Sequence, residues 1–130
     1  MNGKVLACLD VMKLSQERKE SIYKHFLRIK PFIEKYGTKE KLYIEHGYFD
    51  GSFVSFYSEN KNGFVEIQIY SGGISLSCRK EIDGKVIDSD DEWFEIDENR
   101  SYSCFEKDKV RVQIPNKVTE EYIKLGFSYL

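Results

Sequence analysis

Two stretches of alternating residues, joined by a Gly-Gly turn, most constrain how this chain folds. Residues 64–70 and 74–79 alternate apolar with polar side chains, and Ser71-Gly72-Gly73 lies between them. Alternation with period two is typical of a strand with one solvated face. Paired glycines supply the positive φ angles that a tight hairpin turn needs. We therefore predict that residues 64–79 form a β-hairpin in the middle of an antiparallel sheet.

A long amphipathic helix is predicted before the sheet. Ser15 suits the N-cap, and Glu17 places a negative charge in the first turn. Apolar side chains then recur every three or four residues, with basic residues opposite them. The predicted apolar stripe consists of Ile22, Phe26, Ile29 and Ile33. Pro31 is expected to kink or split this helix, and Gly37 is expected to end it.

Other segments carry weaker signals. Residues 4–12 fit either a helix or a short edge strand, and His25 is expected at the surface or boundary of the long helix. Further strands are expected at the ranges 41–49, 52–58, 85–87, 93–96, 102–105 and 110–114. Turns are expected at Asp50-Gly51, over residues 59–63 and at Asp83-Gly84, while the acidic run 88–92 is expected to interrupt the strands. A short helix over 120–125 is expected to be capped by Thr119 and ended by Gly126.

The order of these elements predicts the fold class. The 130 residues, 41% hydrophobic and 32% charged, suit one folded domain over 1–130. Strands that follow one another between helices indicate an α+β fold. We expect an antiparallel meander of about six to seven strands, with one long N-terminal helix and a short C-terminal helix packed on it.

The cysteines and the charge distribution limit which cellular compartment and which kinds of partner are expected. The three cysteines, Cys8, Cys78 and Cys104, lack metal-binding spacing, which predicts buried free thiols in a reducing cytoplasm. The alternatives are a Cys78–Cys104 disulfide or a reactive thiol. The N-terminus lacks the layout of a signal peptide, and no apolar run is long enough for a membrane span. Residues 1–41 carry 10 basic and 5 acidic side chains, whereas residues 42–130 carry 10 basic and 17 acidic ones. This asymmetry fits either a self-complementary pair of layers or an acidic surface that meets a basic partner.

Motifs for catalysis are missing from the sequence. It has no phosphate-binding loop, no Gly-x-Ser-x-Gly elbow and no His-Glu-x-x-His pair. We therefore expect a protein that is not an enzyme and needs no cofactor. The alternative is a small enzyme or ligand-binding domain with a pocket between the long helix and a curved sheet. That pocket would contain His46, Tyr48 and Tyr57.

The segment 88–98, Asp-Ser-Asp-Asp-Glu-Trp-Phe-Glu-Ile-Asp-Glu, is the most specific feature. Acids occupy seven of its eleven positions, around Trp93 and Phe94. It suits a solvated loop, or a protein-binding edge in which an aromatic anchor is surrounded by carboxylates. A calcium loop is a third reading, but the glycine and glutamate of the helix-loop-helix calcium motif are missing. The candidate partner-binding residues are Asp88, Asp90, Asp91, Glu92, Trp93, Phe94, Glu95, Asp97 and Glu98.

Two further partner classes follow from other features of the predicted sheet. The tyrosines of its strands, Tyr43, Tyr48, Tyr57 and Tyr70, suit stacking on nucleic-acid bases, but the acidic charge of the sheet half argues against a nucleic-acid partner. An exposed strand edge would also allow a homodimer.

Size, composition and the acidic segment together resemble the small immunity proteins of bacterial toxin systems. The resemblance implies a single cytoplasmic α+β domain that inhibits a toxin without catalysis. Where such proteins block nucleases, they present carboxylates to the basic cleft of the toxin. The segment 88–98 would be that surface here, and the partner would be a basic protein bound outside any membrane.

Overall fold

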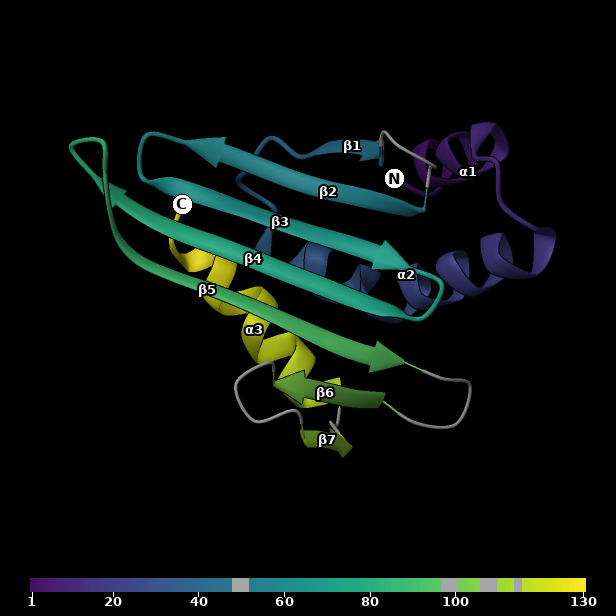
Figure 1. Cartoon of the computed structure of the whole chain (residues 1–130). Coiled ribbons are helices and arrows are strands. Elements are labelled where there is room, and N and C mark those ends of the chain that lie inside the picture. Colours follow the sequence, from purple (N-terminus) through teal and green to yellow (C-terminus); the bar gives the residue numbers. More distant parts are fainter. Residues whose placement is uncertain (48–51, 97–100, 106–109, 114–115) are drawn as a thin grey trace.

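The chain folds into a twisted antiparallel sheet with helices packed on one side (Figure 1). The computed structural model describes residues 1–47, 52–96, 101–105, 110–113 and 116–130; for 94–96, 101–105, 110–113 and 116–118 it describes the backbone alone. The helices are α1 (Asn2–Val11), α2 (Gln16–Tyr36) and α3 (Asn116–Ser128). The strands are β1 (Tyr43–His46), β2 (Phe53–Asn60), β3 (Gly63–Tyr70), β4 (Gly73–Ile82), β5 (Lys85–Ile96), β6 (Ser101–Phe105) and β7 (Val110–Gln113).

Each strand pairs with the next one along the chain, in the order β1 to β7. The α+β class and the antiparallel meander are thus confirmed. The number of strands and the number of helices were predicted only in part. β1–β5 form a five-stranded meander, to which β6 and β7 add two short strands at one edge. Two helices, α1 and α2, precede the sheet instead of one. The segment 4–12, for which the sequence left helix and strand open, is helical: residues 4–11 lie within α1, and Met12 follows as its C-cap.

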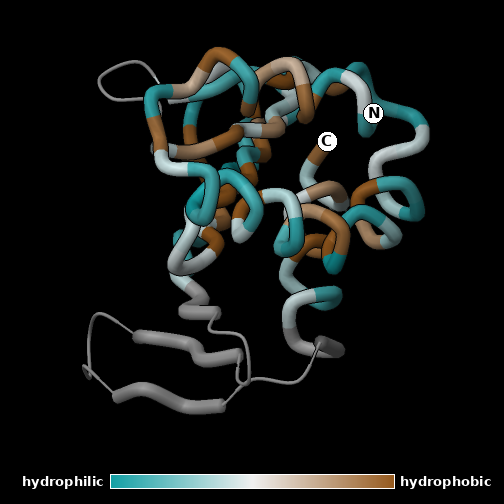
Figure 2. The backbone as a smooth tube through the Cα atoms, turned by 90° about the vertical axis from the view of Figure 1, so that its right-hand side faces the viewer, coloured by the Kyte–Doolittle hydropathy of each residue, from teal (hydrophilic) through white to brown (hydrophobic). Residues whose placement is uncertain are grey.

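The core lies between the sheet and the helices. The predicted apolar stripe of α2 is buried, and it meets the inward residues of β2, β3 and β4. The inward residues of these three strands are Val54, Phe56, Val65, Ile67, Ile69, Ile74, Leu76 and Cys78. Hydrophobic segments accordingly recur in both layers in the end-on view (Figure 2). The predicted hairpin is confirmed, because β3 and β4 flank the turn and Ile69 pairs with Ile74. The positive φ angles expected at Gly72-Gly73 are not found there; among the described residues they occur at Asp83 and Gly84, in the turn between β4 and β5.

Helix α2 differs from the prediction at Pro31, where it continues without a break. Proline removes one backbone donor, whose acceptor would be the carbonyl of Leu27. Both Pro31 and Leu27 are exposed, so water can satisfy that carbonyl. The helix starts with the predicted cap, since the Arg18 amide donates to the Ser15 hydroxyl. It ends at Gly37, where a Cβ would lie only 2.8 Å from the Ile33 carbonyl oxygen.

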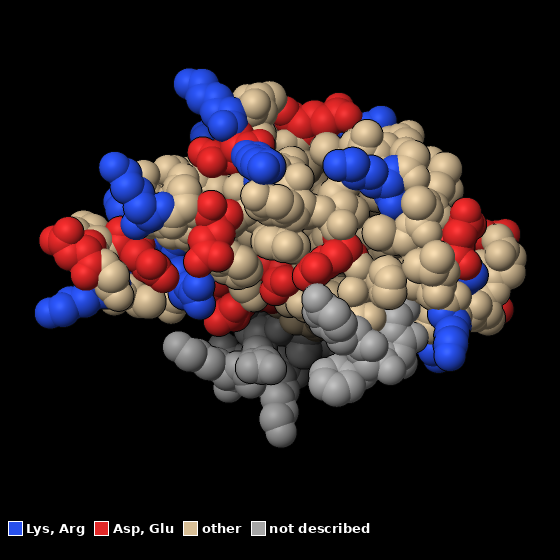
Figure 3. Space-filling view, turned by 90° about the horizontal axis from the view of Figure 1, so that it is seen from above, with Lys and Arg blue, Asp and Glu red and all other residues tan. Residues whose placement is uncertain are grey.

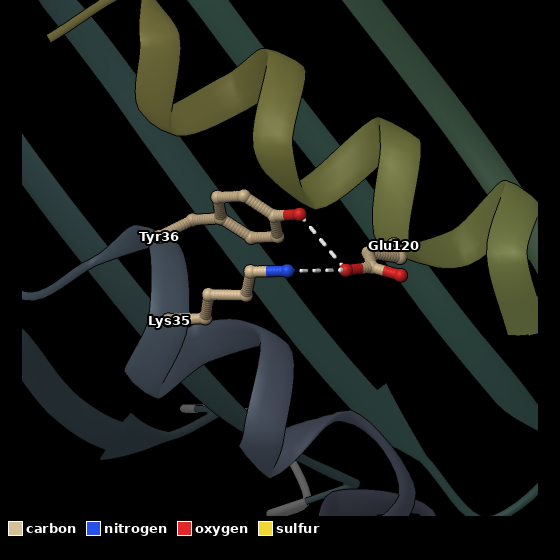
Figure 4. A network of polar contacts seen from close by, with 3 residues as sticks. All are labelled: Lys35, Tyr36 and Glu120. Atoms are coloured by element: carbon tan, nitrogen blue, oxygen red, sulfur yellow. Dashed lines mark hydrogen bonds and ion pairs between the residues drawn. The ribbon is translucent and has the colours of Figure 1, made fainter.

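Helix α3 is longer than predicted and runs through Gly126. Glycine is tolerated there because the helix crosses the sheet closely: a Cβ on Gly126 would lie 2.8 Å from Cγ2 of Val65. Thr119 is therefore inside the helix instead of capping it. Figure 4 shows how α3 is joined to α2. Glu120 accepts a hydrogen bond from the Tyr36 hydroxyl at 2.8 Å and pairs with Lys35 at 3.3 Å, and both contacts keep its pKa below the usual value.

Strand β5 is the largest departure from the sequence prediction. The acidic run 88–92 was expected to interrupt the strands, but it lies within one strand that pairs with β4 along almost its whole length. Acids have low strand propensity, yet they are tolerated here because the strand lies at the side of the sheet and its acids find tyrosine partners on α3 and just after its end. The turn between β2 and β3 is also tighter than expected, because Asn60 pairs directly with Gly63.

None of the helices in the described part of the chain combines the length and the apolar character of a membrane span.

Candidate protein-binding surface

The side of the sheet away from the helices is open along β2–β5 in the described structure (Figure 1). Cross-strand partners share a face of the sheet, so the register identifies its residues. Aromatic side chains dominate this open face: Tyr43, Phe53, Tyr57, Phe64, Tyr70 and Trp93. Carboxylates stand among them, on Glu45, Glu59, Glu66 and Asp91. We call this surface the aromatic face.

Trp93 belongs to an aromatic cluster on this face. Its ring lies edge-on to Tyr70, with 5.3 Å between the centroids, and Tyr70 lies 4.9 Å from Phe53. Tyr70 is on β3 and Trp93 on β5, so the contact spans β4. The contact is possible because the first residue of β4 is Gly73, which lies next to the Ile69–Ile74 pair. Glycine has no side chain that could separate the two rings. The three side chains of the cluster are half-buried.

The carboxylate of Glu66 is held in the middle of the aromatic face. Its Oε2 accepts a hydrogen bond from Ser55 at 3.0 Å, and its Oε1 accepts one from the amide of Gln68 at 3.1 Å. Gln68 in turn accepts a hydrogen bond from the Tyr70 hydroxyl at 2.9 Å. This chain of contacts fixes a negative charge next to the cluster. Neutral hydrogen bonds orient the carboxylate without cancelling its charge.

Two of the rings on this face already hold cations of the same chain. The Lys41 ammonium lies 5.4 Å from the centroid of Tyr43, which stacks on Tyr57. The Arg79 guanidinium lies 4.9 Å from the centroid of Phe64. Such contacts are favourable because the face of an aromatic ring is negative. The rings and carboxylates of the aromatic face are thus of a kind that attracts Lys and Arg side chains.

The predicted binding segment is divided between the two faces of the sheet. Asp91 and Trp93 point to the aromatic face, whereas Asp88, Asp90 and Glu92 point to the side of the helices. Tyr129 donates a 2.8 Å hydrogen bond to Asp88, which raises the pKa of Tyr129 to about 12. Glu92 is held by Tyr122, and partial burial beside Asp90 raises its pKa. The backbones of Phe94 and Glu95 continue the strand, and Asp97 and Glu98 lie outside the described residues.

Cys78 faces the same acids from β4 and is a free thiol, as is Cys8, so no Cys78–Cys104 bridge is formed. Burial, and then the neighbouring Asp90, raise the pKa of Cys78 to about 11. At pH 8 its thiolate fraction should therefore be about a hundredfold below that of an ordinary thiol. We expect Cys78 to alkylate at least a hundredfold more slowly in the native protein than in urea, measured by peptide-resolved mass spectrometry. Equal rates in both conditions would contradict this placement.

The two described residues of the alternative pocket, His46 and Tyr57, do not meet. His46 pairs with the buried Val54 and so lies on the helix side, where its Nδ1 is 3.3 Å from the carbonyl of Gly47. Tyr57 pairs with Glu66 on the aromatic face. Tyr48 lies outside the described residues. His46 and Tyr57 therefore cannot line one cavity, because the sheet separates them.

A groove of about 390 Å³ is found elsewhere, between α1 and α2. Leu6, Leu9, Tyr23 and Leu27 provide its apolar lining, and Asp10, Gln16, Lys19, Glu20 and Lys24 its polar lining. It is not the predicted pocket between helix and sheet, and none of its lining residues is a histidine or cysteine.

His25 is buried, contrary to the prediction that it lies at the surface or boundary. Burial lowers the pKa of its ring, which is therefore neutral at physiological pH. The Nε2–H donates to the carbonyl of Ser71 at 2.9 Å, because a carbonyl can only accept. This bond fastens α2 to the turn between β3 and β4.

The charges are less segregated than the sequence suggested. In the view from above, Lys and Arg side chains are interleaved with Asp and Glu (Figure 3). Within the described part of the chain, no group of three or more His, Cys, Asp or Glu side chains is arranged to hold a metal ion. No protein-family model, curated protein or solved structure matches this chain. The geometry of its surface is accordingly the basis for a functional proposal.

Proposed function

We propose that this protein is a non-enzymatic binding protein that inhibits a basic partner, such as a toxin domain, by covering the partner's working surface. The observation that carries the proposal is the aromatic cluster of Trp93, Tyr70 and Phe53 beside the fixed Glu66 carboxylate. Aromatic anchors bordered by charge are typical of the residues that dominate protein interfaces. The resemblance to toxin-immunity proteins gives the proposal its biological class.

The mechanism requires no chemistry on the partner. Glu66, Asp91 and Glu45 on the aromatic face, with Asp88 and Asp90 nearby, attract Lys and Arg side chains and speed association. The aromatic cluster then packs against the partner and slows dissociation. Because solvent-exposed charges are screened by salt, binding should weaken as ionic strength rises. Free Cys8 and Cys78 suit the reducing cytoplasm, where the proposal places the protein.

The proposal predicts a large effect at Trp93. A basic protein retained by the immobilised wild-type chain and released by salt should bind Trp93→Ala about 30-fold more weakly, the loss typical of an interface anchor. The measurement is a titration by calorimetry. Tyr23→Ala is the matched control, because Tyr23 is a half-buried aromatic on α2, away from the aromatic face.

Circular dichroism must show that both variants keep the wild-type fold. If Trp93→Ala and Tyr23→Ala bind the partner equally well, the aromatic face is not the binding surface. If the retained partner is acidic, or if binding does not change with salt, the proposal of a basic partner is wrong.

A further inference from the structure

Strand β5 has one unpaired edge. It pairs with β4 from Lys85 to Glu95, whereas β6 pairs with it only between Trp93 and Ile96. Residues 85–92, here called the β5 edge, therefore have no strand beside them on the outer side within the described structure. Figure 1 shows β6 lying beside only one half of β5. An antiparallel strand directs alternate N–H and C=O groups to each side, so the outer groups of the β5 edge are free to pair with another strand.

The hairpin that carries this edge also exposes apolar side chains. β4 and β5 extend past the end of β3, because the last β3 pair joins Gly63 to Lys80. In this extension Ile82, Val86 and Ile87 are each more than half exposed. Such residues are usually buried, and here they lie beside unpaired backbone. An incoming strand would cover both.

The charges determine which strand can pair there. Asp88 and Asp90 lie on one face next to the edge, and Asp91 lies on the other. If two copies of this chain paired along their β5 edges, two segments would meet that each carry Asp88, Asp90, Asp91 and Glu92 against the single cation Lys85, and their like charges would repel. A strand with Lys or Arg at successive positions would instead place cations next to acids on both faces. The occupant is therefore a basic extended segment and not a second copy.

We infer that the β5 edge binds an extended, Lys- or Arg-rich segment of the partner by strand addition. In this mode main-chain hydrogen bonds provide affinity, and side chains on alternating faces provide specificity. The inference rests on the proposed function and specifies how the basic partner is held. The partner would continue the sheet beyond β5, next to Asp91 and Trp93, so that the edge and the aromatic face form one continuous surface.

The test uses a short peptide in which pairs of lysines alternate with pairs of valines, so that cations stand on both faces of the strand, added to the full chain at low salt. Its control is the same peptide with every backbone nitrogen methylated, which keeps every charge but removes the donors along both edges. Two signals are followed. Amide hydrogen exchange by NMR reports on the β5 edge, and the fluorescence of Trp93, the only tryptophan of the chain, reports on the aromatic face.

Strand addition predicts that the unmethylated peptide slows exchange at alternate amides within 86–92 by about tenfold or more. The methylated peptide should bind at least about tenfold more weakly, since several main-chain hydrogen bonds are lost. Asp90→Asn combined with Asp91→Asn should weaken binding about fivefold, as expected for two exposed ion pairs. The matched pair Asp10→Asn and Glu17→Gln removes the same charge from the helices and should leave binding unchanged.

Other results separate the inference from the proposed function. If both peptides bind equally and change the Trp93 fluorescence while the edge amides exchange as before, strand addition is wrong and the basic-partner proposal stands. Protection at β1 instead of β5 would also overturn the inference. If neither peptide binds at low salt, both the inference and the proposed charge attraction are overturned.

Discussion

Replacing Phe26 with alanine is expected to lower the free energy of unfolding by about 3–5 kcal/mol. Phe26 is completely buried in α2 and stacks on Phe56 of β2, with 5.5 Å between the ring centroids and an angle of 7° between the planes. The contact joins the helical layer to the sheet, so its loss leaves a cavity between two rigid elements. Domains of this kind are stable by about 5–15 kcal/mol, so the loss is a large share of the total.

The control is the neighbouring residue in the same helix. Leu27 is 45% exposed, and Leu27→Ala should cost about 1 kcal/mol or less, because little area leaves water at that position. Urea unfolding followed by circular dichroism measures both variants. The slope of the unfolding free energy against urea concentration should be the same for both. Equal losses at the two positions would mean that α2 does not pack on β2 through the face described above.

A second large effect is expected where β3 begins. A Cβ on Gly63 would collide with the backbone carbonyl oxygen of Arg79 on β4. A backbone atom in a paired strand cannot move aside as a flexible side chain can. We therefore expect Gly63→Ala to destabilise the protein by about 3 kcal/mol, the upper end for an overpacked site. The same urea measurement tests this value.

Gly72 provides the matched control for Gly63. It lies in the turn at the other end of the β3–β4 hairpin, and a Cβ there would meet no atom within 4 Å. Gly72→Ala should change the free energy of unfolding by no more than about 1 kcal/mol. If alanine is tolerated at both positions, the pairing of Gly63 with Lys80 is not the one described.

Local patterns predicted the elements whose faces differ in polarity. The β3–β4 hairpin follows from its alternation, and α2 follows from its apolar stripe and its Ser15 cap. The prediction failed where tertiary contacts outweigh local preference. The acids of β5 looked like a loop because their tyrosine partners lie thirty or more residues later, at Tyr122 on α3 and at Tyr129 just after it. Gly126 looked like a helix end because its close packing on Val65 is not visible in the sequence.

The candidate surface was predicted only in part for a similar reason. Trp93 and its acids were identified from the sequence, but their division between two faces depends on the register of β5 against β4. The contact of Tyr70 with Trp93 could not be predicted from the strand pattern, because it requires Gly73 to leave space across β4. The grouping of His46 with Tyr57 failed because the sheet separates them.

The position of α3 has a consequence for synthesis on the ribosome. α3 follows every strand in the sequence, yet it packs back on β3 and β4, where Ile123 and Phe127 complete the core. Val65 and Cys78 therefore have no α3 to pack against while the chain emerges. During that interval the nascent sheet presents an apolar surface to solvent and depends on rapid folding or on chaperones to avoid aggregation. A translational pause just before α3 should increase the insoluble fraction.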